Sequence, residues 1–443
     1  MVSAAEQLAA NLNFSAFSKA DELKKRIWFT LGALLVYRLG TYIPLPGIDP
    51  TVWQKVFNSQ AGGILGMFNM FSGGGIDRMA IFALNIMPYI SAAIILQLLT
   101  SVSPKLEALK KEGEAGRKVI NQYTRYLTVV LAFFQSYGIA VGLQGAGNVV
   151  TNPGMFFLLS TAITLTGGTM FLMWLGEQIT SRGIGNGISL IIMAGIVAEL
   201  PSALASMLEL GRQGALSTGI ILIVLIMVVA VIAFIVFMER AQRRLLIQYP
   251  KRQVGNKMFD GQSSHLPLKL NTSGVIPPIF ASSLLLLPTT VANFNAGSGP
   301  EWFQWINTQL GHGRPMFLIL YIALIVFFTF FYTAIVFNPT ETADNLKKHG
   351  GFIPGIRPGE RTAEYIDYVL SRITVPGAVY LAVVCLIPEI LISYAAVPFY
   401  FGGTSLLIVV SVTMDTVSQV QGYLLAHQYE GLIKKSKLRG RRR

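Results

Sequence analysis

The sequence predicts an all-α polytopic membrane protein, and three observations support that fold class. The 443 residues are 52% hydrophobic and only 13% charged, with a mean hydropathy of +0.54, whereas about a quarter of a soluble chain is charged. About ten apolar runs each approach the ~20 residues that a helix needs to cross a bilayer. Lys and Arg are also divided very unequally between the connecting segments.

The predicted spans follow one another along the whole chain. The polar N-terminal segment, residues 1–26, ends in a basic cluster. No convincing cleavage site follows the first apolar run, so that run is interpreted as a retained anchor. The runs are Ile27–Ile43, Met79–Leu99, Leu127–Val141, Met155–Gly176, Ile184–Leu200, Gly219–Met238, Gly274–Ala292, Met316–Phe337, Val375–Ile392 and Tyr400–Val420. Because ten is even, both termini lie on one side.

The basic residues indicate which side that is. Of the 35 Lys and Arg, 30 fall on one side, in residues 1–26, 100–125, 177–183, 239–270, 338–374 and 421–443, and the other side has four: Lys55, Arg78, Arg212 and Arg314. Loops rich in Lys and Arg stay in the cytoplasm, so both termini are predicted to be cytoplasmic. Arg38 lies inside the first span and is interpreted as reaching towards the interface.

The stretch before and within the second span has an unusual composition. Residues 66–72 are too few to span and too apolar to lie in water. The three glycines at 73–75 lack a Cβ and allow a hinge. Pro88 predicts a bend in the span, and Ile86 and Ile90 lie one helical turn apart. We predict a small movable helix that acts as a stopper beside a pore wall; the alternative is an ordinary buried helix with packed isoleucines.

Two long cytoplasmic segments, 239–270 and 338–374, mix charges with turn-forming Gly and Pro, which is typical of structured projections. In the second, Phe352–Ile356 places apolar residues beside Arg357, as a protein-docking knob would. We predict protein-binding loops; the alternative is a charged anchor that contacts only lipid headgroups. The basic tail Lys434–Arg443 suits anionic lipid or ribosomal RNA phosphate, or is a solvated topology signal.

Side chains for chemistry are scarce. Asp415 has no apparent acidic partner for a protease dyad. Residues 182–187 (RGIGNG) lack the preceding strand and the lysine of a phosphate-binding loop. Cys385 is the single cysteine, so no internal disulfide can form. The four histidines lie in loops or at a span end without metal-ligand spacing: His265, His312, His349 and His427. We therefore expect no catalytic residue, no metal, no cofactor and no enzyme.

The spans offer isoleucine at helical spacing instead, at Ile86 and Ile90 and again at Ile188 and Ile192. A ring of β-branched apolar side chains cannot hydrate ions and gates a pore by dewetting. Such a ring is indifferent to the side chain that passes it, which favours a conduit for unfolded polypeptide. The main alternative, a small-solute transporter, needs ionisable groups near the midplane, and the span interiors have almost none. A membrane protease based on Asp415 is a distant third.

Five long segments, in order, closely resemble bacterial members of the SecY/Sec61-alpha family. They are FNMFSGGGIDRMAIFALNIMPYISAAIILQLL (68–99), MFLMWLGEQITSRGIGNGISLIIMAGI (170–196), SHLPLKLNTSGVIPPIFASS (264–283), FNPTETADNLKKHGGFIPGIRPGERTAEYI (337–366) and VPFYFGGTSLLIVVSVTMD (397–415). The resemblance runs from about Lys24 to the basic tail, and residues 1–20, 142–152 and 293–315 carry no particular match.

The resemblance implies ten helices in two inverted pseudo-symmetric five-helix halves around a central pore, with a short plug helix. The chain would then divide into a cytoplasmic segment 1–26, a first half 27–200, a periplasmic hinge loop 201–218, a second half 219–420 and a basic cytoplasmic tail 421–443. The halves would open like a clamshell about the hinge.

The function implied is the central subunit of a protein-conducting channel in the bacterial cytoplasmic membrane. It moves unfolded secretory polypeptides across and releases transmembrane segments laterally. The partners implied are SecE and SecG in a heterotrimer, the SecA ATPase, the translating ribosome, SecDF, YidC, signal sequences, unfolded preproteins and anionic lipids. No cofactor is implied.

The resemblance also carries over residue by residue. The pore ring falls on Ile86, Ile90, Ile188, Ile192, Ile279 and Ile408. The plug falls on Gly66, Met67, Phe68, Asn69, Met70, Phe71, Ser72, Gly73, Gly74 and Gly75. The lateral gate, between spans two and three and spans seven and eight, includes Ser91, Phe134 and Asn271, and docking of SecA or the ribosome falls on Arg243, Arg244 and Arg357. Asn85 departs from the family, where a small residue such as glycine is expected.

Overall fold

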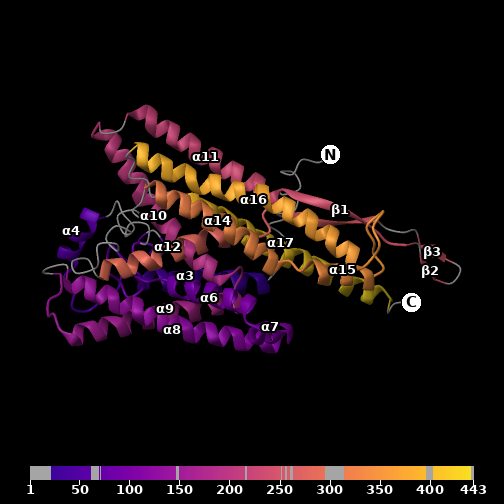
Figure 1. Ribbon diagram of the computed structural model, residues 1–443, viewed down its shortest axis with the longest axis horizontal. Helices are drawn as coiled ribbons and strands as arrows, with labels where there is room; N and C mark the ends of the chain where they lie inside the picture. The colour runs from indigo at the N-terminus through magenta and orange to yellow at the C-terminus, as the bar shows by residue number, and fades with distance from the viewer. Residues whose placement is uncertain are drawn as a thin grey trace. The chain divides into compact units, whose positions relative to one another are not determined.

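The chain folds mainly into long helices. The computed structural model describes residues 21–60, 69, 71–145, 149–214, 217–250, 252–254, 257–259, 263–294, 314–395 and 403–440 (Figure 1). Each of the ten predicted spans overlaps a helix: α3 (Asp21–Gly40), α6 (Met87–Val102), α8 (Glu114–Gly145), α9 (Met155–Arg182), α10 (Gly187–Arg212), α11 (Thr218–Arg240), α12 (Ile276–Phe294), α14 (Pro315–Val336), α16 (Glu360–Ala395) and α17 (Gly403–Gly440). The predicted order of helices is confirmed.

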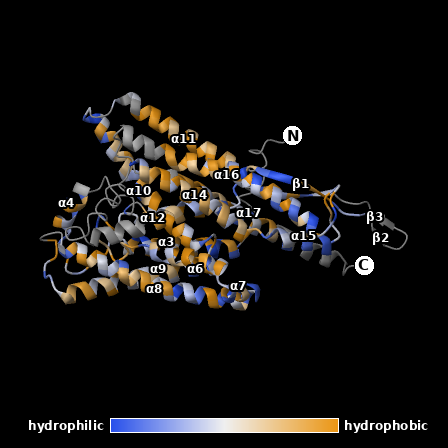
Figure 2. Ribbon diagram, viewed as in Figure 1, coloured by the Kyte–Doolittle hydropathy of each residue, from blue (hydrophilic) through white to orange (hydrophobic). Residues whose placement is uncertain are grey.

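By length and composition, six of the described helices can cross a membrane, and the count is seven if the bent pair of α6 and α7 (Pro104–Lys111), with 98° between its members, is one span. Figure 2 shows α14 mostly in the hydrophobic colour and strand β1 in the hydrophilic one. Helix α3 is less apolar because four basic residues lie within it: Lys24, Lys25, Arg26 and Arg38. The described apolar spans are thus mainly helical, which suits a bilayer without water for backbone groups.

The contacts divide the chain into two compact units. The first comprises Met1–Ala205, Pro288–Gln304 and Ile408–Arg443, and in it α8 packs on α6 and α9, and α3 packs on α9. The second comprises Ser206–Leu287 and Trp305–Leu407, and in it α16 packs on α11 and α14 (Figure 1). The predicted second half ends at residue 420, whereas the compact units assign residues from Ile408 onward to the first unit.

The second span begins later than the sequence predicts. Residues 73–86 form turns, and α6 starts at Met87. Met79 (φ 46°) and Asn85 (φ 48°) have left-handed backbones, which an α-helix cannot contain. Pro88 therefore lies in the first turn of α6, where a missing N–H costs nothing, and the predicted bend at Pro88 is wrong. Ile86 and Ile90 still share a turn, because the Ile90 N–H donates to the Ile86 carbonyl at 3.1 Å.

The predicted hinge loop 201–218 is helical over most of its length. Helix α10 continues through Pro201 to Arg212, and α11 begins at Thr218. The residues after Pro201 include Ala203, Leu204 and Met207, which favour a helix and outweigh the single lost donor. The connection between the two spans is therefore shorter than predicted.

Short helix α4 (Pro50–Gln60) follows the first span. Asp49 precedes it and accepts hydrogen bonds from the Thr51 backbone N–H at 2.9 Å and the Thr51 hydroxyl at 2.7 Å. These bonds stabilise the carboxylate and lower the pKa of Asp49. The Trp53 indole N–H donates to the Ile76 carbonyl at 2.7 Å, so α4 is fastened to the turns that precede α6.

The segment 239–270 contains the strands of the structure, which the all-α prediction did not foresee. Strand β1 (Gln242–Gln248) pairs antiparallel with β4 (Ser263–Lys269), with Leu245 opposite Leu266. Strands β2 (Arg252–Val254) and β3 (Lys257–Phe259) pair with each other. The short helix α15 (Pro339–Lys348) lies in the other long segment and packs on α16. Both segments are structured, as predicted.

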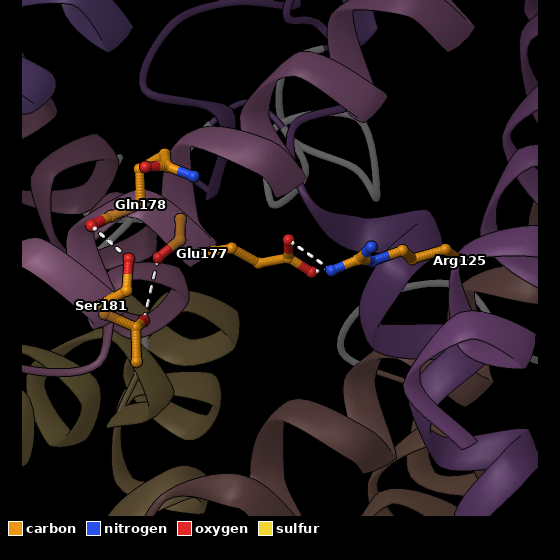
Figure 3. Close-up of polar contacts among 6 residues, drawn as sticks. Arg125, Glu177, Gln178 and Ser181 are labelled. Carbon is orange, nitrogen blue, oxygen red and sulfur yellow. Dashed lines mark hydrogen bonds and ion pairs between the residues drawn. The ribbon is translucent and has the colours of Figure 1, made fainter. Parts of the chain in front are cut away.

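Arg125 of α8 and Glu177 of α9 form a two-pronged ion pair, with Nε–Oε1 and Nη2–Oε2 distances of 3.0 and 2.7 Å (Figure 3). Their side chains are 48% and 32% exposed. We expect Arg125→Gln to lower the free energy of unfolding by less than about 1 kcal/mol, because water and salt screen such pairs. Chemical unfolding in detergent measures this. A loss above about 2 kcal/mol would mean that the pair behaves as a buried one.

Candidate functional site

The described part of the predicted plug is one helical turn followed by a glycine turn. Asn69, Phe71 and Ser72 are helical, and Gly73 and Gly74 have φ angles of 64° and 79°. The Asn69 carbonyl accepts from the Gly74 N–H and the Ser72 hydroxyl, both at 3.0 Å. Gly66, Met67, Phe68 and Met70 of the predicted plug lie outside the described residues.

Three successive carbonyls of this turn each accept a hydrogen bond from a side chain elsewhere in the first unit. The Asn85 amide donates to the Phe71 carbonyl, the Tyr37 hydroxyl donates to the Ser72 carbonyl at 3.3 Å, and the Arg38 guanidinium donates to the Gly73 carbonyl. The last carbonyls of a helix have no partner within it. The side chains of Asn85, Tyr37 and Arg38 supply the missing partners of these carbonyls. We call these three residues and Gly195 the plug seat.

Gly195 of α10 forms the floor of the plug seat. A Cβ added at Gly195 would lie 2.9 Å from both the Phe71 carbonyl oxygen and the Tyr37 hydroxyl. A Cβ added at Gly73 would lie 2.9 Å from the Gly195 Cα. The two backbones therefore approach more closely than any residue with a side chain allows, and Phe71 and Ser72 are buried.

Charged groups surround the glycine turn. The Arg78 guanidinium stacks on the Tyr42 ring at 4.2 Å, and the Arg38 guanidinium lies over the same ring at 5.0 Å. Partial burial raises the pKa of the Asp77 carboxyl, and the neighbouring Arg78 opposes that shift. The Asp77 backbone N–H donates to the Asn69 side chain at 2.8 Å, which ties the turn to the predicted plug.

Sequence reasoning missed most of the plug seat. The sequence interpreted Arg38 as a side chain that reaches towards the interface, and in the structure its guanidinium bonds the Gly73 carbonyl and the exposed Tyr42 hydroxyl. An arginine inside an apolar span was the signal available. Nothing in the sequence singles out Tyr37 or Gly195, which lie far from residues 71–73 along the chain.

The predicted ring isoleucines divide between the two units. Ile279, on α12, belongs to the second unit, and the other five belong to the first. Within the first unit, Thr413 of α17 donates to the Met193 sulfur at 3.6 Å, so α17 contacts α10 beside Ile192. Ile188 is half-buried, and the other five ring residues are buried: Ile86, Ile90, Ile192, Ile279 and Ile408.

The three predicted gate residues have different surroundings. Ser91 of α6 is buried, whereas Phe134 of α8 is 67% exposed. Asn271, in the second unit, is buried, and its amide donates to the Glu239 carboxylate at 2.6 Å and to the Gly274 carbonyl at 3.1 Å. The Ser273 hydroxyl donates to the Asn271 amide oxygen at 3.0 Å, which completes a polar cluster at the start of α12.

The two long segments predicted to be cytoplasmic join into one structure, which we call the loop platform (the described residues of 239–270 and 338–374). Gln248 and Phe352 exchange two backbone hydrogen bonds, at 2.9 and 3.0 Å. Leu245 and Leu268 from the hairpin form a core with Ile353 and Ile366 from the other segment. The platform is thus one packed structure built from two separate stretches.

The three arginines predicted to dock partners are exposed on the loop platform: Arg243, Arg244 and Arg357. In the predicted apolar knob at 352–356, Ile353 is 6% exposed and Ile356 packs against the platform core, whereas Phe352 is half-buried and Pro354 is exposed. The Thr362 hydroxyl donates to the Arg357 carbonyl at 2.9 Å and holds the backbone of that arginine. The platform therefore presents the positive charge of Arg357 beside a partly exposed apolar segment.

Comparisons with known proteins bear on the family and the fold of the chain. The family model for SecY matches residues 80–417. The chain is 56% identical to the protein translocase subunit SecY of Escherichia coli (strain K12), over 96% of this chain and 97% of that protein. One similar solved structure is a SecY whose plug domain stabilises the closed state of the translocation channel and maintains a membrane seal (TM-score 0.64, 19% identity, 91% of this chain and 93% of that one). Another is Sec61 in the canine ribosome-channel complex from the endoplasmic reticulum (TM-score 0.60, 16% identity, the same coverage). With a family model over three quarters of its length and a relative of this identity from end to end, the chain belongs to the SecY family.

Proposed function

We propose that this chain is the channel subunit of a protein translocase, which moves unfolded secretory polypeptides across the membrane and releases transmembrane segments into it. It conducts protein and is not an enzyme. The observation that carries the proposal is the plug seat. It holds residues 71–73 noncovalently, by three side-chain hydrogen bonds and by close packing against Gly195. A segment bound in this way can leave when a substrate enters.

Two kinds of substrate segment need two exits. An apolar segment gains about 0.3 to 0.6 kcal/mol for each central Leu, Ile, Phe or Val that moves into lipid. A polar segment cannot follow, because each unsatisfied backbone group in hydrocarbon costs several kcal/mol. A pore that also opens sideways serves both. Ile86, Ile90, Ile188, Ile192, Ile279 and Ile408 form the constriction of that pore in this proposal.

The lateral exit lies beside Ser91, Phe134 and Asn271. Asn271 donates a hydrogen bond to Glu239, and both residues belong to the second unit. Asn271 therefore keeps a hydrogen bond whenever it separates from the other gate residues. A signal sequence holds the gate open by binding the open state more tightly than the closed one.

The loop platform receives the cytoplasmic partners. Its exposed arginines Arg243, Arg244 and Arg357 suit acidic surfaces of the SecA ATPase or the phosphates of ribosomal RNA. SecE and SecG complete the heterotrimer, and SecDF, YidC and anionic lipids are further partners. The membrane is the bacterial cytoplasmic membrane, with both termini in the cytoplasm, because 30 of the 35 Lys and Arg lie on that side.

Crosslinking tests the proposed constriction. In a Cys385→Ser chain, single cysteines replace Ile86, Ile279 or Ile408, and a stalled secretory polypeptide carries one crosslinkable residue. We expect all three cysteines to capture the polypeptide at the same substrate position, because a ring has one level along the pore. A cysteine at Ile163, which is 64% exposed on α9, serves as the control and stays unlinked. Capture by none of the three ring cysteines in the assembled complex would reopen the small-solute transporter.

A further inference from the structure

Asn85 has a backbone conformation that few residue types tolerate. Its φ is 48°, in the left-handed region, where Gly, Asn and Asp are the residues with least strain. The glycine expected from the family resemblance meets the same backbone requirement. This backbone conformation therefore explains why Asn can replace glycine here. It does not explain the Asn85 side chain, because glycine adopts the same conformation equally well.

The Asn85 side chain makes a specific contact that glycine cannot make. The residue is only 2% exposed, and its amide nitrogen donates to the Phe71 carbonyl, 14 residues earlier in the chain. No described residue bonds its Oδ1 atom. A buried amide left half-satisfied costs stability, so the donor bond to the plug is what offsets the burial of this side chain.

Asn85 also lies next to the first residue of the proposed pore ring, Ile86. Ile86 is the N-cap of α6, and Ile86 and Ile90 are the ring residues on that helix. The bond from Asn85 to Phe71 thus joins the last helical turn of the plug to the residue next to the ring. Tyr37 and Arg38 hold the two following carbonyls from a different element, α3.

We infer that Asn85 is a positioning residue that latches the plug onto the start of α6 and favours the closed channel. This inference rests on the proposed function, because it assumes that residues 66–75 act as the plug. Removing the Asn85 amide takes one buried hydrogen bond, the bond to the Phe71 carbonyl, from the plug seat and leaves the backbone turn intact. Opening by a substrate then breaks a contact directly beside Ile86.

Two substitutions separate the latch from its backbone. Asn85→Gly keeps the left-handed turn and removes the amide. Asn85→Asp keeps the turn and the side-chain size but replaces the donor with an oxygen that faces the Phe71 carbonyl. In a Cys385→Ser chain, Ser72→Cys provides a buried reporter thiol on the plug. The reaction of this reporter thiol with a membrane-impermeant maleimide added from the periplasmic side is followed in the full complex without substrate.

We expect both variants to raise the labelling rate of the reporter thiol, by about three- to tenfold for Asn85→Gly, the range for one lost hydrogen bond, and by more for Asn85→Asp. An increase in Asn85→Gly alone would overturn the latch, because added backbone freedom then explains it. No increase in either variant also overturns it.

Two positive controls keep the latch and the proposed function apart. Gly195→Val, which fills the floor of the plug seat, and a stalled secretory polypeptide should each raise labelling of the reporter thiol if the plug moves at all. When they do so and the Asn85 variants do not, the latch is wrong and the plug stands. When neither raises it, the plug assignment fails, and the latch fails with it.

Discussion

Replacing Gly195 by valine is expected to open the channel at rest. Even the first added carbon would lie 2.9 Å from the Phe71 carbonyl oxygen and from the Tyr37 hydroxyl, and both of those atoms belong to the contact that holds the plug. The valine methyl groups add further volume against the same backbone. Overpacking of this kind costs about 1–3 kcal/mol, and release of the plug relieves it.

The measurement is ion flux through the reconstituted complex without substrate, where a shift of 1–3 kcal/mol corresponds to a rise of about five- to 150-fold. Gly167→Val is the matched control, because Gly167 also lies in a spanning helix and a Cβ there meets nothing within 4 Å. Resting flux equal to that of the unmodified chain would show that α10 does not bear on the plug.

Reversing the charge of Arg357 is expected to reduce ATP-driven translocation strongly and to leave resting ion flux unchanged. Arg357 is exposed, and the Thr362 hydroxyl holds its backbone carbonyl, so the loop platform presents this charge in a fixed place. Placing a carboxylate opposite an acidic partner removes an attraction and adds a repulsion. A loss of 2 kcal/mol or more, about thirtyfold in affinity, is typical of a paired charge at an interface.

Import into membrane vesicles and binding of the motor ATPase to the same vesicles measure this effect. Arg361→Glu is the control, because Arg361 lies in the same segment, is exposed and pairs with Glu364 at 3.7 Å. Equal losses from the two variants would indicate a general electrostatic effect and argue against docking at Arg357.

The sequence by itself determined the membrane architecture. Ten apolar runs predicted the order of the spans, and the division of Lys and Arg predicted their orientation, because a bilayer imposes the same length and charge rules on every helix that crosses it. Hydropathy also predicted that residues 66–72 are apolar and too short to span. These are local properties, which a reader of the chain can measure without knowing which segments meet.

The tertiary structure alone decided what the plug rests on and how the loops combine. Tyr37, Asn85 and Gly195 meet residues 71–73 only after α3 and α10 have packed, and Gln248 meets Phe352 only after two distant segments have paired. The late start of α6 depends on the left-handed backbones at Met79 and Asn85, which hydropathy cannot register. Such contacts satisfy individual carbonyl and amide groups, and no periodicity of the sequence encodes which partner each group finds.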